Sequence, residues 1–220
     1  MSRRLQIDVF FDFICPWCLI GKRQLEHALV QFRSRHPDVQ ISTAWHGVQL
    51  LPQLPVDGEP FADFYRKRLG NADAMTMRQA QVQQAAAAVG LNIDLSQIET
   101  MPNTADAHRL FERVNAVGNA AQREMLLERL FAAYFRKREN LGCRETLLDI
   151  TRACGVDTDM VLDCLKGGAT PFAGSPGATS GVPGFRFDRR MTVIGAQPAQ
   201  ALLGAMHEAL KERERERQPA

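Results

Sequence analysis

The chain has 220 residues, of which 45% are hydrophobic and 24% charged, and its formal net charge is +2. This composition is ordinary for a globular protein, and the small net charge argues against nucleic acid or an anionic membrane as a partner. No stretch approaches the ~18 uninterrupted apolar residues of a membrane span. Asp8 and Asp12 interrupt the apolar N-terminal segment, which has no signal-peptide cleavage site, so we expect a cytoplasmic protein.

The N-terminal part predicts a strand, a helix and a second strand. Residues Leu5 to Ile14 are rich in aromatic and β-branched side chains, which favours a buried strand. From Pro16 to about Arg35 the apolar residues recur at helical spacing, and proline suits the first position of a helix. The alternation from Val39 to Trp45 indicates the second strand. Together these elements form a βαβ unit.

The middle of the chain predicts a block of helices. Apolar residues recur at helical spacing in segments that are separated by Gly, Pro and Asn: Asp63 to Leu69, Met75 to Val89, Asp106 to Val117, Ala120 to Arg138, Arg144 to Ala153, and Thr158 to Lys166. The segments share no common sequence period, so a helical solenoid is not expected.

The C-terminal part predicts a loop, a hairpin and a helix. A Gly/Pro/Ser-rich loop covers Gly167 to Gly181, and a short β-hairpin follows with its turn at Asp188 to Arg190. Pro198 opens the last helix. The order βαβ, helical block, ββα predicts an α/β protein with a thioredoxin fold and a large all-helical insertion. We assign residues 1–48 and 168–220 to the core domain, and residues 49–167 to the inserted helical domain.

A Cys-x-x-Cys motif lies where the first strand gives way to the first helix. Cys15 takes the N-cap position and Cys18 follows one turn later, so the helix dipole favours a thiolate at Cys15 and the two sulfurs can close a disulfide. This pattern favours redox chemistry. The alternative is half of a zinc site, but the chain has no second Cys-x-x-Cys and no paired histidines, so no metal is expected. The other three cysteines, Cys143, Cys154 and Cys164, are expected to be free thiols.

These motifs resemble the DsbA-like thioredoxin-fold oxidoreductases, and specifically their cytoplasmic FrnE-like branch. The matching residues span most of the chain in the family's order: Phe11-Asp12-Phe13, Cys15-Pro16-Trp17-Cys18 with Gly21, Asn103-Thr104, Ala107-His108-Arg109-Leu110, Ala133-Tyr134-Phe135, Gly181-Val182-Pro183 and Gly195-Ala196-Gln197-Pro198. The resemblance implies a thioredoxin core with a helical insertion, in agreement with the element order.

The motif assigns roles to the residues around the two cysteines. Cys15 is expected to attack a disulfide and Cys18 to resolve the mixed disulfide, while Pro16 and Trp17 set the balance between thiolate and disulfide. The Val182-Pro183 pair resembles the cis-proline loop of the thioredoxin fold, which would place the Val182 backbone beside Cys15. The alternative is an ordinary trans turn.

Three residues outside the motif are candidates for supporting roles. Many relatives carry an acidic residue six positions before the first cysteine, where this chain has Val9, so Asp12 is the nearest candidate for a buried proton acceptor. Asn103 or Thr104 is expected to cap the helix that follows. His108 is expected either to be a structural histidine or to contact the redox site, because the helical block folds over that site in relatives.

We therefore expect a thiol-disulfide oxidoreductase, acting in a reducing cytosol as a disulfide reductase or isomerase on a protein or small-molecule disulfide. It would need no cofactor besides its redox-active disulfide, with glutathione a possible electron donor or co-substrate, and it could form a homodimer. The first alternative is a glutathione-dependent isomerase or transferase, of the kind seen in kappa-class glutathione transferases and 2-hydroxychromene-2-carboxylate isomerases. Those relatives generally have serine in place of Cys15 and lack the second cysteine. The second alternative is a non-catalytic interaction module on the same fold.

Overall fold

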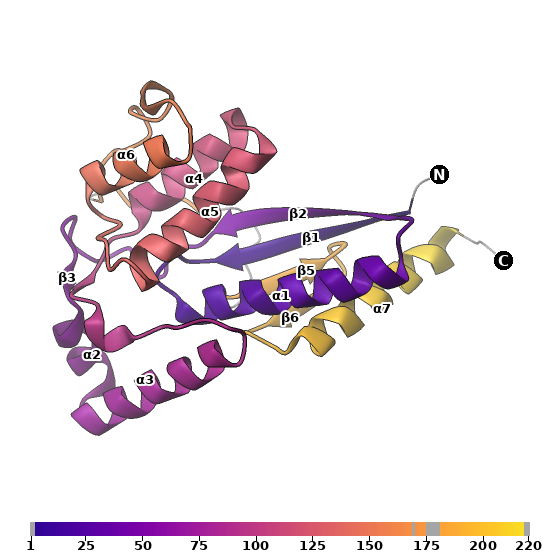
Figure 1. Cartoon of the computed structure of the whole chain (residues 1–220), viewed down its shortest axis with the longest axis horizontal. Coiled ribbons are helices and arrows are strands. Elements are labelled where there is room, and N and C mark those ends of the chain that lie inside the picture. The colour runs from indigo at the N-terminus through magenta and orange to yellow at the C-terminus, as the bar shows by residue number, and fades with distance from the viewer. Residues whose placement is uncertain (1–2, 169, 175–180, 218–220) are drawn as a thin grey trace. The chain divides into compact units, whose positions relative to one another are not determined.

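The structure is a computed structural model that describes residues 3–168, 170–174 and 181–217 (Figure 1). Part of the predicted Gly/Pro/Ser-rich loop, residues 169 and 175–180, lies outside the described residues. The chain divides into two compact units. The sheet unit comprises Met1–Phe11, Trp17–His46 and Ser175–Ala220, and the helical unit comprises Asp12–Pro16 and Gly47–Gly174. Across the described ranges, no helix combines the length and the apolarity that crossing a membrane requires.

The sheet unit is built on a four-stranded sheet with the strand order β2-β1-β5-β6. Its elements are β1 (Arg3–Phe11), α1 (Pro16–Arg35), β2 (Val39–Gly47), β5 (Gly184–Phe187), β6 (Met191–Ile194) and α7 (Ala199–Arg217). The arrows of β1 and β2 point the same way in Figure 1, as a βαβ unit requires. β5 runs antiparallel to β1, with Val9 opposite Phe185, and pairs with β6 in a hairpin. The predicted βαβ unit and hairpin are confirmed.

The core of the sheet unit follows from the alternation of side chains along β1. Successive residues of a strand point to opposite faces, and Leu5, Ile7 and Val9 all contribute to one apolar cluster. The helices contribute residues at helical spacing: Leu25, Ala28 and Phe32 from α1, and Leu202, Met206, Ala209 and Leu210 from α7. Each large apolar side chain buried in this way stabilises the unit by about 1.5–3 kcal/mol.

The helical unit contains the predicted block of helices. Its elements are α2 (Phe61–Leu69), α3 (Ala72–Ala87), η1 (Leu95–Gln97), α4 (Ala105–Val117), α5 (Ala120–Phe135), α6 (Arg144–Ala153) and η2 (Thr158–Met160). A two-stranded sheet of β3 (Glu59–Pro60) and β4 (Thr100–Met101) was not predicted, because strands of two residues have no readable alternation.

Several predicted elements end earlier in the structure: the helix predicted to reach Arg138 ends at Phe135, and the helix predicted to reach Val89 ends at Ala87. The helix predicted over Thr158 to Lys166 is wrong beyond Met160, where only the single turn η2 forms. The carbonyls of Leu162 and Leu165 accept hydrogen bonds from the Arg144 guanidinium, a distant partner that replaces helical hydrogen bonding. The strand predicted to reach Ile14 ends at Phe11, because the chain turns after Asp12.

Candidate active site

The two cysteines of the motif lie at the start of α1. Cys15 immediately precedes Pro16, the first residue of the helix, and Cys18 lies in its first turn. Neither cysteine is in a disulfide; Cys15 is 8% exposed and Cys18 is 1% exposed, while Trp17 between them is half-buried. The first turn of α1 contains no acidic residue, so no carboxylate there offsets the positive end of the helix dipole.

A tight turn joins β1 to the helix and sets the position of Cys15. The Cys15 backbone N–H donates to the Asp12 carbonyl oxygen at 3.2 Å, and the Ile14 N–H faces the Asp12 carboxylate at 3.4 Å. The Asp12 carboxylate also accepts a hydrogen bond of 2.7 Å from the Leu50 N–H. Asp12 therefore ties the turn before Cys15 to a distant segment of the helical unit.

Asp12 is paired with His108 of α4. The His108 Nε2 atom lies 3.1 Å from Asp12 Oδ1, and both side chains are 0% exposed. Beside a carboxylate, this ring nitrogen acts as the donor. The structure therefore brings together two residues that are 96 positions apart and that the sequence singled out separately.

Aromatic rings and a glycine enclose the His108 side chain. The Phe13 and Phe172 rings each lie with their centroids 5.0 Å from the imidazole, and the Phe172 ring stacks on it at 22°. A Cβ atom at Gly47 would lie 2.5 Å from His108 Nδ1, which no real contact allows. Gly47 is therefore needed to let the end of β2 pass the imidazole.

Two tyrosines of the helical unit, to which the sequence assigned no role, are the half-buried Tyr65 and the buried Tyr134. Burial raises the pKa of Tyr65 in α2; the charges of Arg78 and Arg68 oppose this shift, and a Cys15 thiolate adds to it. Burial also raises the pKa of Tyr134 well above its usual value, with a smaller contribution from Tyr65. Both phenols are therefore neutral hydrogen-bond donors at physiological pH.

The Val182-Pro183 peptide bond is cis, as the sequence predicted. A Cβ atom at Gly21 of α1 would lie 3.0 Å from Pro183 Cγ and 3.0 Å from the Phe185 ring, so the backbone of α1 approaches the loop at this point. Gly21 is one turn after Cys18, which makes the two residues neighbours on the surface of α1. The proline loop therefore lies against the helix that carries Cys18.

Of the two residues expected to cap α4, Thr104 has the N-cap position but its side chain makes no cap hydrogen bond, and the Asn103 side chain bonds the start of the helix instead. The Asn103 Oδ1 atom accepts hydrogen bonds from the Ala105 N–H at 3.0 Å and from the Gln49 side chain at 2.9 Å. Its amide nitrogen donates to the carbonyls of Leu54 at 2.7 Å and Gly168 at 3.2 Å. Asn103 thus joins three segments of the helical unit, and within the described residues these are its partners.

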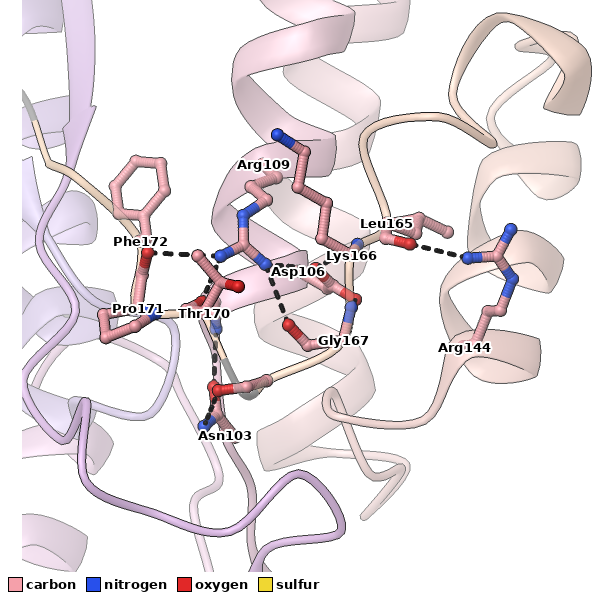
Figure 2. Close-up of polar contacts among 12 residues, drawn as sticks. Asn103, Asp106, Arg109, Arg144, Leu165, Lys166, Gly167, Thr170, Pro171 and Phe172 are labelled. Carbon is pink, nitrogen blue, oxygen red and sulfur yellow. Dashed lines mark hydrogen bonds and ion pairs between the residues drawn. The ribbon is translucent and has the colours of Figure 1, made fainter.

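The first turn of α4 continues this network toward the segment that follows α6 (Figure 2). The Asp106 carboxylate accepts hydrogen bonds from the backbone N–H groups of Lys166 at 2.9 Å and Gly167 at 2.7 Å. Arg109 pairs with Asp106 and donates to the carbonyls of Gly167, Thr170 and Pro171. The Asp106 and Arg109 side chains, together with Asn103, therefore hold residues 166–168 and 170–171 against the first turn of α4.

A second carboxylate, Asp8 in β1, was also not singled out by the sequence. It lies 3.2 Å from His46 Nε2 and 3.2 Å from the Arg186 guanidinium, and His46 stacks on Phe10. Burial raises the pKa of Asp8, but hydrogen bonds from Gln6, His46 and Arg186 together outweigh it and hold the pKa below its usual value. The sequence signal that could have identified Asp8 is a carboxylate within an otherwise apolar strand, at a position that faces away from the apolar cluster.

The remaining cysteines differ in their surroundings. Cys143 is exposed at the start of α6, where hydrogen bonds from the Thr146 backbone and side chain lower its pKa. Cys154 and Cys164 are buried, and burial raises the pKa of each. Over the described part of the chain, no group of three or more His, Cys, Asp or Glu side chains is arranged to hold a metal ion.

The chain matches a family of known proteins along most of its length. A family model described as a DSBA-like thioredoxin domain matches residues 6–207. The crystal structure of a probable DsbA oxidoreductase from Streptomyces coelicolor is 25% identical, with a TM-score of 0.79, and the match covers 98% of this chain and 92% of that one. The predicted thioredoxin fold with a helical insertion is confirmed.

Two further solved structures share the fold at lower identity. A 2-hydroxychromene-2-carboxylate isomerase is 15% identical with a TM-score of 0.61, covering 97% of this chain and 100% of that one. The cytosolic disulfide reductase DsbM from Pseudomonas aeruginosa, solved with GSH, is 14% identical with a TM-score of 0.54, covering 96% of this chain and 98% of that one. At these identities the likeness concerns the fold alone.

Proposed function

Because the chain belongs to the DSBA-like thioredoxin domain family, we propose that it is a thiol-disulfide oxidoreductase in which Cys15 attacks and Cys18 resolves. The observation that carries the proposal is the position of two thiols, neither of them in a disulfide, at the start of α1, one before the helix and one in its first turn. Disulfide exchange begins with attack by a cysteine sulfur, here at the start of a helix, and the thiolate is the nucleophile in this reaction.

The reaction proceeds by two exchanges. The Cys15 thiolate attacks one sulfur of a substrate disulfide, so a Cys15-substrate disulfide forms and the other substrate sulfur leaves as a thiolate. The Cys18 thiolate then attacks the Cys15 sulfur, which releases the second substrate thiolate and leaves a Cys15-Cys18 disulfide. The substrate gains two electrons, and the cysteine pair loses two. An external dithiol or two thiols must then reduce the pair.

The Asp12–His108 pair is proposed as a positioning device for this chemistry. The Asp12 carbonyl oxygen accepts a hydrogen bond from the Cys15 N–H. Its carboxylate pairs with His108 and accepts a hydrogen bond from the Leu50 N–H. These hydrogen bonds support a role for Asp12 in holding the turn, so that Cys15 stays aligned with the first turn of α1. Gly21, against which Pro183 lies, supports a similar role for the proline loop beside Cys18.

We place the reaction in a cytoplasm that glutathione keeps reducing, where the pair would be held as thiols and would act as a reductase or isomerase. Glutathione is the proposed electron donor. The likeness in fold to a cytosolic disulfide reductase solved with GSH supports this choice. Equilibration of the purified protein with glutathione buffers of defined ratio measures the potential of the pair. A potential well above that of the cytosolic glutathione pool would overturn the reductive direction.

The cysteine roles are tested by trapping the mixed disulfide. Cys18→Ala should accumulate a covalent adduct with a peptide disulfide, detectable by intact-mass spectrometry, whereas Cys15→Ser should form none and should lose turnover. Cys143→Ser is the matched control, because Cys143 is an exposed thiol with a lowered pKa that could react nonspecifically. Adducts that persist in Cys15→Ser but vanish in Cys143→Ser would refute the assignment.

A glutathione-dependent isomerase is the competing function, because a 2-hydroxychromene-2-carboxylate isomerase has the same fold. Disulfide reduction by the proposed mechanism requires Cys18, whereas isomerisation through an enzyme-bound glutathione does not require a second protein thiol. Assays of wild type and Cys18→Ala with 2-hydroxychromene-2-carboxylate and glutathione separate the two. Isomerisation that is fast and unaffected in Cys18→Ala would favour the isomerase.

A further inference from the structure

The four-stranded sheet has two edge strands, and they differ in length and in flanking charge. Within the described part of the chain, β2 and β6 each have a strand neighbour on one side only. β6 has four residues and directly follows Arg189 and Arg190, whereas β2 has nine residues. An edge strand presents unpaired N–H and C=O groups to any other strand, and natural proteins reduce this by shortening the edge or adding charge. β6 has this protection.

β2 lacks the residues that protect an edge strand. Its sequence, VQISTAWHG, contains no Lys, Arg, Asp, Glu or Pro. Its one titratable side chain, His46, pairs with Asp8 of the neighbouring strand β1. Gln40, Ser42 and Thr43 are exposed. The sequence of β2 therefore offers no like-charge repulsion to a second copy of the same strand.

Two apolar side chains of β2 remain partly exposed. Ile41 and Trp45 pack against the apolar cluster of the sheet unit, but neither is fully buried. The Trp45 ring meets the Phe11 ring edge-on, with the centroids 5.5 Å apart. Tryptophan is among the residues most enriched at the energetic centres of protein interfaces. A partner strand would remove the exposed parts of both side chains from water, which is favourable.

The sequence of β2 is complementary to itself in an antiparallel arrangement. Thr43 is the fifth of its nine residues, so a two-fold axis at Thr43 pairs the whole strand with its copy. This register places Ile41 of each copy opposite Trp45 of the other, and Thr43 opposite its own counterpart. Pairs of an aromatic with a β-branched residue, and pairs of threonines, are both favourable across antiparallel strands. A two-fold interface requires this kind of self-complementarity.

We infer that two copies of this chain associate through β2, antiparallel and with the two-fold axis at Thr43. The four strands of each copy then form one continuous sheet. Nine residues extend over about 30 Å, and with a thickness of about 10 Å the edge contributes about 300 Å² per copy. A standard stable interface buries about 800 Å² per partner, so we expect a reversible dimer that dissociates on dilution. The inference does not depend on the proposed redox function.

Sedimentation velocity over a dilution series of the full chain tests the inference, in reducing buffer so that the exposed Cys143 cannot cross-link copies. Wild type should pass from dimer to monomer on dilution. Thr43→Lys and Thr43→Glu should each raise the dissociation constant at least about tenfold, because identical charges face each other at the axis. An equimolar mixture of the two variants should restore association, because opposite charges then face each other.

The matched control is Thr192→Glu, because Thr192 is an exposed residue of the other edge strand and lies opposite Arg186 of β5. This variant should dimerise like wild type. Circular dichroism checks that all variants fold. A wild type that is monomeric at every concentration would overturn the inference. So would equal weakening by Thr43→Glu and Thr192→Glu, unchanged association of Thr43→Lys, or a mixture that stays monomeric.

Hydrogen exchange of the wild-type protein is a second measurement that needs no variant. Amide groups of β2 should become more protected as the protein concentration rises, because the second copy pairs with that edge, whereas amide groups of β6 should not change. Protection of β2 that is the same at both ends of the dilution series would overturn the inference. Concentration-dependent protection confined to β6 would also overturn it, because the interface would then be the other edge.

Discussion

Replacing Asp12 with alanine should destabilise the protein by about 2–6 kcal/mol, the cost of leaving two buried hydrogen-bond donors without an acceptor. Asp12 and His108 are both fully buried, with Nε2 3.1 Å from the carboxylate. The same carboxylate accepts the Leu50 N–H at 2.7 Å. Alanine leaves both donors without an acceptor in a place that the surrounding rings close to water.

The magnitude can be built from the contacts. Each buried donor left without a partner costs about 1–3 kcal/mol, so the imidazole and the Leu50 N–H together account for about 2–6 kcal/mol. This is a large fraction of the 5–15 kcal/mol that stabilises a typical domain. Asp12→Asn keeps the side-chain volume and one carbonyl oxygen for Leu50, so it should cost less, about 1–2 kcal/mol. The order of stability should be wild type, asparagine, alanine.

Urea unfolding followed by far-ultraviolet circular dichroism measures these differences by linear extrapolation. A double-mutant cycle of Asp12→Asn with His108→Gln isolates the pair, for which we expect a coupling energy of about 1–3 kcal/mol. A positioning role also predicts a functional readout: Asp12→Ala should slow formation of the Cys15 mixed disulfide in protein that is still folded, and Asp12→Asn should restore part of that rate.

Asp63→Ala is the control, because the Asp63 side chain in α2 is 44% exposed and pairs with Arg66 one turn away, so its loss should change little. If Asp12→Ala lowers the free energy of unfolding as little as the control does, the carboxylate is hydrated and its hydrogen bond to His108 contributes no stability. Strictly additive effects of Asp12→Asn and His108→Gln would show that the two residues are not coupled.

Three further changes test other parts of the structure. Asp8→Asn should lower the free energy of unfolding by about 1–2 kcal/mol at pH 7. Because the pKa of Asp8 is lowered in the folded protein, the ionised carboxylate stabilises the fold above its unfolded pKa of about 3.9, and this stabilisation is lost as the pH falls through the folded pKa. The stabilities of variant and wild type should therefore converge in acid, and a difference that disappears already near neutral pH would contradict this. Gly47→Ala should cost about 1–3 kcal/mol, because its Cβ would lie 2.5 Å from His108 Nδ1, and an unchanged melting temperature would contradict this packing. Iodoacetamide at neutral pH should modify Cys143 well before Cys154, since hydrogen bonds lower the pKa of the first and burial raises that of the second; peptide mapping that finds the reverse order would refute this.

Local sequence signals predicted the elements that place the two cysteines. The run of β-branched and aromatic residues before Asp12, the proline at the first position of α1, and the order of the strands all depend on neighbours in the chain. The same holds for the polar residues expected before α4, where the Asn103 side chain bonds the Ala105 N–H two residues on. The helix predicted beyond Met160 was wrong because its carbonyls have a partner in Arg144, which no local pattern reveals.

The sequence by itself therefore determined the strand-helix junction that carries Cys15 and Cys18, because helix propensity, capping and strand alternation act over a few residues. Only the tertiary structure decided which distant groups complete the surroundings. His108 lies 96 positions from Asp12 and Asp188 lies 182 positions from Gln6, yet both pairs are in hydrogen-bond contact. Such pairings arise because burying the apolar side chains of an element also buries some polar groups of the same element. The polar groups must then find partners, and which ones they meet depends on the packing of the whole unit.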